Sequence, residues 1–339
     1  MPKKKSLTLQ RVLVLLLAYI MLAVCGGVAA SVLFVPGVIG ANKAAKAVIP
    51  SLKVENVDFD VTSLPQKSTM YARDGSTVIA TFYNQNRIVV PLKKISKTMQ
   101  QAVVAREDRR FWTHAGVDVQ GVMRAFVQTY LVKGSQQGGS SLTQQYVKNV
   151  LLMQAIEDDD SIAQYHATED TIARKIREML ISVQMEKKYS KAEILQGYLN
   201  IAQFGNNLYG VETAAQRYFS VSAADLNVVQ SATIAAITKN PSLYDPLVEE
   251  NQKESENQRN IVLKLMLQEG YITQKQYTEA VNTPLKDTLK AQDVNVGCQD
   301  TGDYAYFCDF VVHRIQNSEE FGKTRAERNK LLQEGGLKI

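Results

Sequence analysis

The feature that most constrains this chain is a long apolar run near its N-terminus, from Val12 to Ala41, in which no residue is charged. A bilayer core needs about 20 apolar residues, whereas the apolar part of a cleavable signal peptide has about 7–15. The run exceeds both lengths, so we predict a cytoplasmic tip and an uncleaved transmembrane anchor within residues 1–41. A buried core helix fits this length poorly. Because Lys3, Lys4 and Lys5 precede the run, the rest of the chain should lie outside the membrane.

The composition indicates a globular protein with one or two hydrophobic cores, since 45% of its 339 residues are hydrophobic and 22% are charged. The net charge of +5 comes from lysines and arginines that are scattered along the chain. This distribution argues against nucleic acid as a partner. It fits an anionic membrane surface or a phosphorylated substrate better.

Two of the three cysteines, Cys298 and Cys308, lie in a turn-rich stretch of the part that should be exported. Disulfides persist in such compartments, so we predict that these two residues pair. The chain has only three histidines, and none has the spacing of a zinc ligand.

The pattern after the anchor divides into three parts. Residues 42–95 form a connector that ends in "STMYARDGSTVIATF" and "NRIVVPL", two alternating segments, the first with an Asp-Gly turn signal that predicts a β-hairpin. Residues 96–290 have a helical pattern and are long enough to form one domain. Residues 291–339 return to loop and strand character and close on "GGLKI", which is typical of the start of a strand. The fold class is therefore mainly α with a small β-hairpin.

The segment "VVAREDRRFWTHAGVD", residues 103–118, places two acids at the end of a helix. Helical spacing directs Glu107 between Val103, Val104 and Phe111, and Asp108 toward another side. Apolar neighbours disfavour a charged carboxylate, which suits a general base. A surface glutamate paired with a neighbouring arginine explains the segment equally well.

The segment "GSQQGGSSLTQQYVKNVLL", residues 134–152, predicts a helix that begins after two glycines. Ser141 and Gln144 have the spacing of a capping box. A helix N-terminus with hydroxyls, amides and Lys148 within its first turns suits phosphate groups. An ordinary capped helix after a flexible loop is the alternative.

A third segment, residues 171–200, predicts a helix with apolar residues on two sides. One side carries Arg174 and Glu178 four residues apart, with Lys175 at its edge. The other side is an apolar stripe: Ile172, Ile176, Met179, Leu180 and Val183. A helix enclosed on both sides should direct its charged group into a cleft, although a structural ion pair remains open.

Together these segments resemble the peptidoglycan glycosyltransferases of family 51, found in class A penicillin-binding proteins and in monofunctional transglycosylases. The resemblance covers about residues 70–250. The first family motif matches at Glu107, Asp108, Phe111, His114, Gly116 and Asp118, the second at "GGSSLTQQYVKN", and the third at Arg174, Lys175 and Glu178. Four positions depart from the usual pattern. Ser141 and Ser220 replace a threonine and a glycine, and Gln203 replaces a tyrosine. Gln230 also stands for a glutamate.

The resemblance implies a lysozyme-like helical domain that polymerises lipid II with inversion and releases undecaprenyl pyrophosphate. Glu107 is then the general base, and Glu178 is the second catalytic glutamate, which holds the nearby cations or a divalent metal. The other implied substrate-binding residues are Lys148, Arg174 and Lys175 at the pyrophosphate, Ser140, Gln144 and Gln145 at phosphate or sugar, and Asp108 and His114 as organisers of the cleft. The sequence requires no cofactor, although Mg²⁺ or Mn²⁺ fits the pyrophosphate site.

The resemblance also implies partners and a place in the cell. These are lipid II and the growing glycan chain, membrane lipids, cell-elongation or cell-division proteins, and a site at the outer surface of a bacterial cell membrane. Residues 122–132 either dip into the membrane interface or pack as an ordinary helix. Residues 291–339 resemble the linker to a transpeptidase domain, whose motifs are absent from this sequence, so a bifunctional protein is favoured over a monofunctional enzyme.

Two other functions fit parts of the pattern. A lysozyme-like enzyme that cleaves glycan would share the fold, but it needs no pyrophosphate site and leaves the basic cluster at Lys148, Arg174 and Lys175 without a purpose. A membrane-tethered scaffold for cell-wall proteins would not need Glu107.

Overall fold

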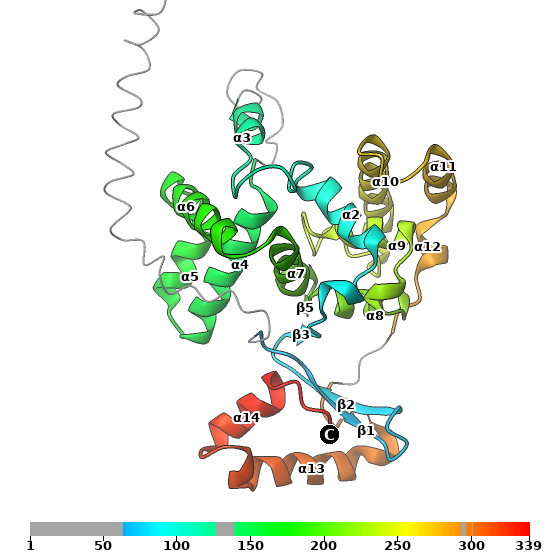
Figure 1. Ribbon diagram of the computed structural model, residues 1–339. Helices are drawn as coiled ribbons and strands as arrows, with labels where there is room; N and C mark the ends of the chain where they lie inside the picture. The colour runs from blue at the N-terminus through cyan, green and yellow to red at the C-terminus, as the bar shows by residue number, and fades with distance from the viewer. Residues whose placement is uncertain (1–63, 127–138, 293–295, 300) are drawn as a thin grey trace, which may run out of the picture. The chain divides into compact units, whose positions relative to one another are not determined.

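The computed structural model describes residues 64–126, 139–292, 296–299 and 301–339 (Figure 1). The predicted anchor in residues 1–41 and the connector up to residue 63 lie outside these ranges. Among the described residues, no helix combines the length and the apolar character that a bilayer span requires.

The described part of residues 96–290 is mainly helical, as predicted. Its helices are α2 (Lys97–Glu107), α3 (Val119–Phe126), α4 (Leu142–Glu157), α5 (Ser161–Thr168), α6 (Ile172–Lys188), α7 (Lys191–Ile201), α8 (Val211–Phe219), α9 (Val228–Ile237), α10 (Gln252–Gln268), α11 (Gln274–Asn282) and α12 (Leu285–Thr288). Polar caps begin several of them. Ser96 accepts a hydrogen bond from the Met99 amide at the start of α2, and Ser141 and Ser190 form capping boxes on α4 and α7.

The centre of the helical region is built around α9. This helix packs against α2, α8 and α10, while α4 packs against α5, α6 and α7 (Figure 1). From Ser231 to Ile237 every residue of α9 is buried, and five of these seven are alanine, serine or threonine, whose small side chains let neighbouring helices approach closely. The C-terminal end of α9 therefore lies deep between other elements, a point that matters for the site.

A small sheet links two distant segments of this region. Its strands are β3 (Asn86–Arg87), β4 (Gln203–Gly205) and β5 (Leu208–Tyr209), in the order β3-β5-β4, with β3 parallel to β5 and β4 antiparallel to it. The alternation of "NRIVVPL" predicted a longer strand, which is wrong. Beyond Arg87 the backbone amides of Val89 and Val90 donate to the side chains of Gln66 and Asn200, so no neighbouring strand pairs there.

The predicted hairpin is confirmed as β1 (Ser68–Tyr71) and β2 (Val78–Phe82). Asp74 accepts hydrogen bonds from the Thr77 hydroxyl and from the Ser76 and Thr77 amides, which lower the pKa of its carboxyl to about 2. Gly75 has φ +69°, a left-handed conformation that glycine adopts at little cost.

The prediction of loop and strand is wrong for residues 305–315, because the chain forms α13 (Ala305–Asn317), followed by α14 (Arg325–Glu334). Cys308, Val311, Val312 and Ile315 have helical spacing, and this stripe packs against the hairpin. The β-branched side chains of Val311, Val312 and Ile315 favour a strand by propensity, but burial of this stripe against the hairpin overrides that preference.

The last residues behave as predicted for "GGLKI". Leu337 and Ile339 accept backbone hydrogen bonds from Thr69 and Tyr71 of β1, in a parallel arrangement. Cys298 and Cys308 form the predicted disulfide. The hairpin and residues 296–339, which the sequence assigned to opposite ends of the exported part, thus share one small core, here called the hairpin module: Met70, Ile79, Ala80, Phe82, Cys308, Ile315 and Leu332.

Candidate active site

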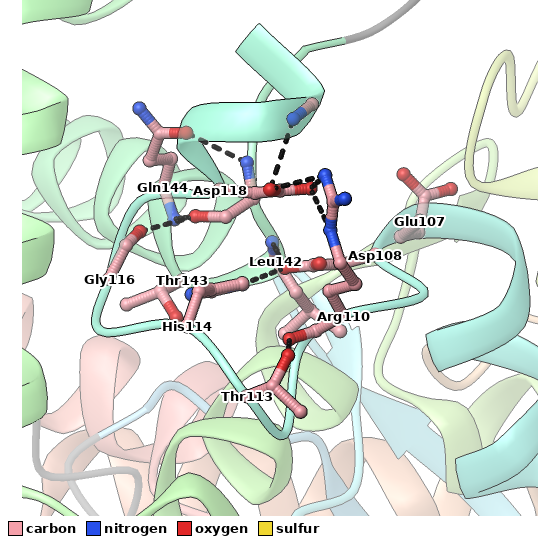
Figure 2. Close-up of polar contacts among 12 residues, drawn as sticks. Glu107, Asp108, Arg110, Thr113, His114, Gly116, Asp118, Leu142, Thr143 and Gln144 are labelled. Atoms are coloured by element: carbon pink, nitrogen blue, oxygen red, sulfur yellow. Dashed lines mark hydrogen bonds and ion pairs between the residues drawn. The ribbon is translucent and has the colours of Figure 1, made fainter.

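The two acids at the end of α2 leave the helix in different directions, as the sequence predicted. Figure 2 shows Asp108 turned toward His114 and Leu142, while Glu107 points away from that group. The two carboxylates therefore belong to different environments, although they are neighbours in the chain.

Asp108 organises the start of α4. Its Oδ2 accepts hydrogen bonds from His114 Nε2 at 2.7 Å and from the backbone amide of Leu142 at 2.9 Å (Figure 2). The carboxylate side chain is only 1% exposed. Leu142 is the first residue of α4, so a negative charge here satisfies one unpaired amide and complements the helix dipole. In this position Asp108 holds the helix that carries the rest of the site.

The loop between α2 and α3 is held by hydrogen bonds within the loop and by contacts with Ser141 and α6. Arg110 binds both carboxylate oxygens of Asp118, with nitrogen–oxygen distances of 2.6 and 2.7 Å, and the Ser141 hydroxyl donates to the Gly116 carbonyl at 2.6 Å (Figure 2). Gly116 has φ +85°, and a Cβ there would lie 2.7 Å from the backbone of Ser182 on α6. Only glycine allows the loop to approach α6 this closely.

Glu107 is held by neutral donors. Its Oε2 accepts from Gln145 Nε2 at 2.7 Å, and its Oε1 accepts from the Thr238 hydroxyl at 2.6 Å. Among the described residues no lysine, arginine or histidine forms an ion pair with Glu107. The neighbouring arginines are used elsewhere, since Arg106 donates to Gln258 and Arg110 binds Asp118. The alternative of a surface salt bridge for Glu107 is therefore wrong.

Glu178, in contrast, is buried among cations. Arg174 Nη1 donates to Glu178 Oε1, and Lys175 Nζ lies 3.3 Å from Glu178 Oε2. The side chains of Glu178 and Arg174 are 2% and 7% exposed, whereas that of Lys175 is 38% exposed. Lys175 also donates to the Ser140 hydroxyl at 2.8 Å, which joins the second and third sequence segments.

The side of α6 that carries Arg174 and Glu178 is the buried one. The predicted apolar stripe on the other side is not enclosed, because Ile172 is 80% exposed and the rest of the stripe is partly exposed. The charged group is thus held inside by its ion pairs and by the Gly116 loop, not by apolar cover on both sides.

Lys148 lies on α4, close enough to the buried group around Glu178 to feel its charges. Burial lowers the pKa of Lys148, and the positive charges of Arg174 and Lys175 lower it further, while Glu178 opposes this shift. Lys148 follows Gln145 by three residues on α4, which places both on one side of the helix. Because Gln145 contacts Glu107 and Lys148 adjoins the Glu178 group, both glutamates border the same stretch of α4.

Residues 75–267 match the family described as Transglycosylase, which is more than half of the chain. The chain belongs to this transglycosylase family. Among curated proteins, penicillin-binding protein 4 of Bacillus subtilis is 38% identical over 79% of the chain, and penicillin-binding protein 1A of Aquifex aeolicus is 39% identical over 68%. Penicillin-binding protein 1A/1B of Bacillus subtilis is 32% identical over 85% of the chain.

The chain spans less than half the length of these relatives. It spans 40% of the first, 29% of the second and 30% of the third. A crystal structure of penicillin-binding protein 1A from Haemophilus influenzae covers 81% of the chain at 23% identity, with a TM-score of 0.42, while the chain covers 27% of that protein.

Several residues predicted to bind substrate form hydrogen bonds within the protein that hold neighbouring elements in place. Gln144 is completely buried, and its Oε1 accepts from the Ser141 amide to close the capping box. Asp108 holds α4, and the side chain of His114, 9% exposed, lies between Asp108 and Lys191. Ser140, Gln145, Lys148 and Lys175 are partly exposed, as is His114.

Three residues at the site were missed by the sequence analysis. Thr238 contacts Glu107 directly. Lys191 lies 4.6 Å above the ring of Phe111 and 2.8 Å from Glu186, whose carboxylate also accepts from Thr143. Lys191 opens a helix four residues after the Glu186-Lys187 pair, and nothing in that local pattern indicates its contact with Phe111.

Among the residues that the structure describes, the side chains of the site do not form a cage for a metal ion. Within the described ranges, no group of three or more histidine, cysteine, aspartate or glutamate side chains comes together. Both oxygens of Glu178 already accept from cations. A Mg²⁺ ion bound through one carboxylate would need substrate phosphates and water as its other ligands, and it stays a prediction.

Proposed function

We propose that this chain is a peptidoglycan glycosyltransferase that polymerises lipid II into β-1,4-linked glycan strands. The observation that carries the proposal is the arrangement along α4, where Gln145 contacts a glutamate without a cationic partner and Lys148 adjoins a buried cationic group. One end can take a proton and the other can receive an anionic leaving group. The transglycosylase match over residues 75–267 supports it.

In the proposed reaction Glu107 removes the proton of the 4-hydroxyl group of an acceptor sugar. The hydroxyl oxygen then bonds to the anomeric carbon of the donor, and the bond to undecaprenyl pyrophosphate breaks with its electron pair. The lack of an ion pair leaves Glu107 free to accept the proton, because an adjacent cation would favour its charged form.

The basic residues divide the work of balancing the departing diphosphate. Lys148 and Lys175 are partly exposed and carry mobile ammonium groups that can reach phosphate oxygens. Arg174 is buried against Glu178 and the Glu169 carbonyl, so it supplies positive charge from behind. Preorganised charges of this kind stabilise a transition state without the cost of reorienting water.

The remaining parts of the proposal concern the whole protein. The helical region adopts a lysozyme-like fold, residues 12–41 anchor it in a bacterial cell membrane, and the chain is the N-terminal half of a bifunctional penicillin-binding protein. The exposed Val119 and Met123 on α3, 66% and 57% exposed, support contact of this side with the membrane interface. Its partners are then lipid II, the growing glycan, membrane lipids and proteins of cell elongation or division.

The test is incubation of the purified protein with labelled lipid II, with and without moenomycin, an inhibitor of the family that the chain resembles. We expect glycan polymer whose formation moenomycin stops. Shortening of mature glycan without polymer formation would instead support a lysozyme-like hydrolase. Wild-type polymer synthesis in a Glu107→Gln variant would contradict the assignment of the base and would favour a scaffold.

A further inference from the structure

We propose that Thr238 is a positioning residue whose hydroxyl group holds Glu107 in both of its protonation states, an inference that rests on the proposed function. Thr238 is the C-cap residue of α9, and its Oγ1 lies 2.6 Å from Glu107 Oε1 and 2.8 Å from the Ala235 carbonyl oxygen. A hydroxyl group has one proton to donate and lone pairs that accept. Thr238 therefore has two acceptors, Glu107 and the Ala235 carbonyl, for one proton. Its hydroxyl also interacts with that of Tyr198.

The two acceptors allow the Thr238 hydroxyl to act either as a donor to Glu107 or as an acceptor from it. When Glu107 is ionised, Thr238 donates to the carboxylate, because a hydrogen bond to a charged acceptor is the stronger one. When Glu107 has taken a proton, its carboxyl group can donate to Thr238 Oγ1, and the Thr238 proton turns to the Ala235 carbonyl. Neither state leaves a buried polar group without a partner, which would otherwise be costly.

Gln145 on the other side of Glu107 cannot do this. The Tyr198 hydroxyl lies 3.4 Å from Gln145 Oε1, which directs the amide NH₂ group toward Glu107 Oε2 at 2.7 Å. Burial raises the pKa of Tyr198 well above its usual value, and the negative charge of Glu107 raises it further, so this hydroxyl stays protonated. An amide NH₂ group only donates. The proton is thus better accommodated on Oε1, which faces Thr238.

The reversible contact matters because a general base changes state in every turnover. The sugar hydroxyl proton moves to Glu107 while the oxygen bonds to the anomeric carbon and the diphosphate leaves with the electron pair. Glu107 is then a neutral acid until it releases the proton to water. A residue that fits only the charged form would resist the proton transfer, whereas Thr238 fits both forms.

The fold explains why a threonine at this position can act on Glu107. The last carbonyls of a helix lack intrahelical partners, and Ala235 belongs to the last turn of α9. The buried seat of α9 brings this turn to the end of α2, although Thr238 and Glu107 are 131 residues apart in the chain. The described groups that face Glu107 are Thr238 after α9, Gln145 on α4 and Tyr198 on α7.

The test compares three variants of the full chain in lipid II polymerisation. Thr238→Val removes the hydroxyl and keeps the shape, Thr238→Ser keeps the hydroxyl, and Thr233→Val is the matched control. Thr233 lies on the same helix, is buried, and donates only to the Val229 carbonyl. We expect Thr238→Val to lower kcat about tenfold without changing KM, and the other two to stay within about twofold of wild type.

Two results would overturn the proposal. One is a kcat for Thr238→Val that matches the Thr233→Val control, and the other is a Thr238→Ser variant as slow as Thr238→Val. Melting temperatures of both valine variants show whether a loss comes from unfolding, since each removes one hydroxyl that donates within the protein.

A second measurement does not depend on catalysis. In protein with ¹³C-labelled threonine methyl groups, the Thr238 signal is assigned by its absence in Thr238→Ser. We expect it to shift with pH in a titration that disappears in Glu107→Gln, and a signal insensitive to pH contradicts the proposal. If wild type makes no polymer, the proposed function fails, and this titration still decides the role of Thr238.

Discussion

The two glutamates of the site border one helix, yet they are treated in opposite ways. Glu107 accepts hydrogen bonds from an amide and a hydroxyl, at 2.7 and 2.6 Å, and has no cationic partner in the described structure. Glu178 is 2% exposed and is paired with Arg174 and Lys175. The difference lies in the partners of the two carboxylates: neutral donors hold the first, while cations pair with the second.

The substitution with the largest expected effect is Glu107→Gln. Loss of a general base lowers the rate about 10²–10⁴-fold, and the neutral contacts around Glu107 should leave folding intact. Polymer yield from labelled lipid II gives the rate, and thermal unfolding gives the stability. A large loss of melting temperature would show that Glu107 is structural, which would break the comparison.

The same change at Glu178 should act on stability first. Glu178→Gln leaves the buried Arg174 with the exposed Asp170, 3.7 Å away, in place of a buried anionic partner, and breaking a buried ion pair costs about 3–5 kcal/mol. We expect a clear drop in the free energy of unfolding, measured by urea titration, together with weaker polymerisation. Equal stability of the Glu178→Gln and Glu107→Gln variants would mean that the two environments do not differ as described.

The charge of Lys148 should set the alkaline limit of activity. Its pKa is lowered by burial and by Arg174, so Lys148 loses its proton at a lower pH than an ordinary lysine, and its charge is lost as pH rises through that value. We expect kcat/KM to fall as pH rises through this range, and the fall to move to higher pH in Lys148→Arg, since arginine stays charged. The same pH profile for both proteins would remove Lys148 from the anion site.

The smallest effect on catalysis should come from the hairpin module. Replacing Cys298 and Cys308 with alanine opens a disulfide that links residues 10 apart, which should cost roughly 3 kcal/mol of module stability. Polymerisation measured well below the melting temperature should stay at the wild-type level, because in the described structure neither glutamate has a hydrogen bond or ion pair with this module. A marked loss of activity would show that the module supports the site.

The sequence predicted the local features of this fold well. The helix cap at Ser141, the turn at Asp74-Gly75 and the spacing of Arg174 and Glu178 are all confirmed. Each depends on residues within a few positions of one another, where periodicity and backbone preferences act directly. The stripe from Cys308 to Ile315 was also local, but its strand-favouring residues concealed the helical spacing.

What the sequence could not decide was the environment of each charged group. Its residues left Glu107 open between a base and a surface ion pair, because Arg106 and Arg110 were equally close in the chain. In the folded protein Arg106 donates to Gln258 and Arg110 binds Asp118. Packing likewise turned Gln144 inward as part of a cap, although Gln144 and Gln145 look alike in the sequence.

The sequence by itself determined which residue types were available and which of them shared a helix face. Only the tertiary structure decided that Glu107 contacts Thr238 and that no cation of the described residues forms an ion pair with it. The physical reason is that helical and turn spacing act over a few residues, whereas the charge state of a carboxylate depends on every group within a few ångströms, wherever in the chain that group begins.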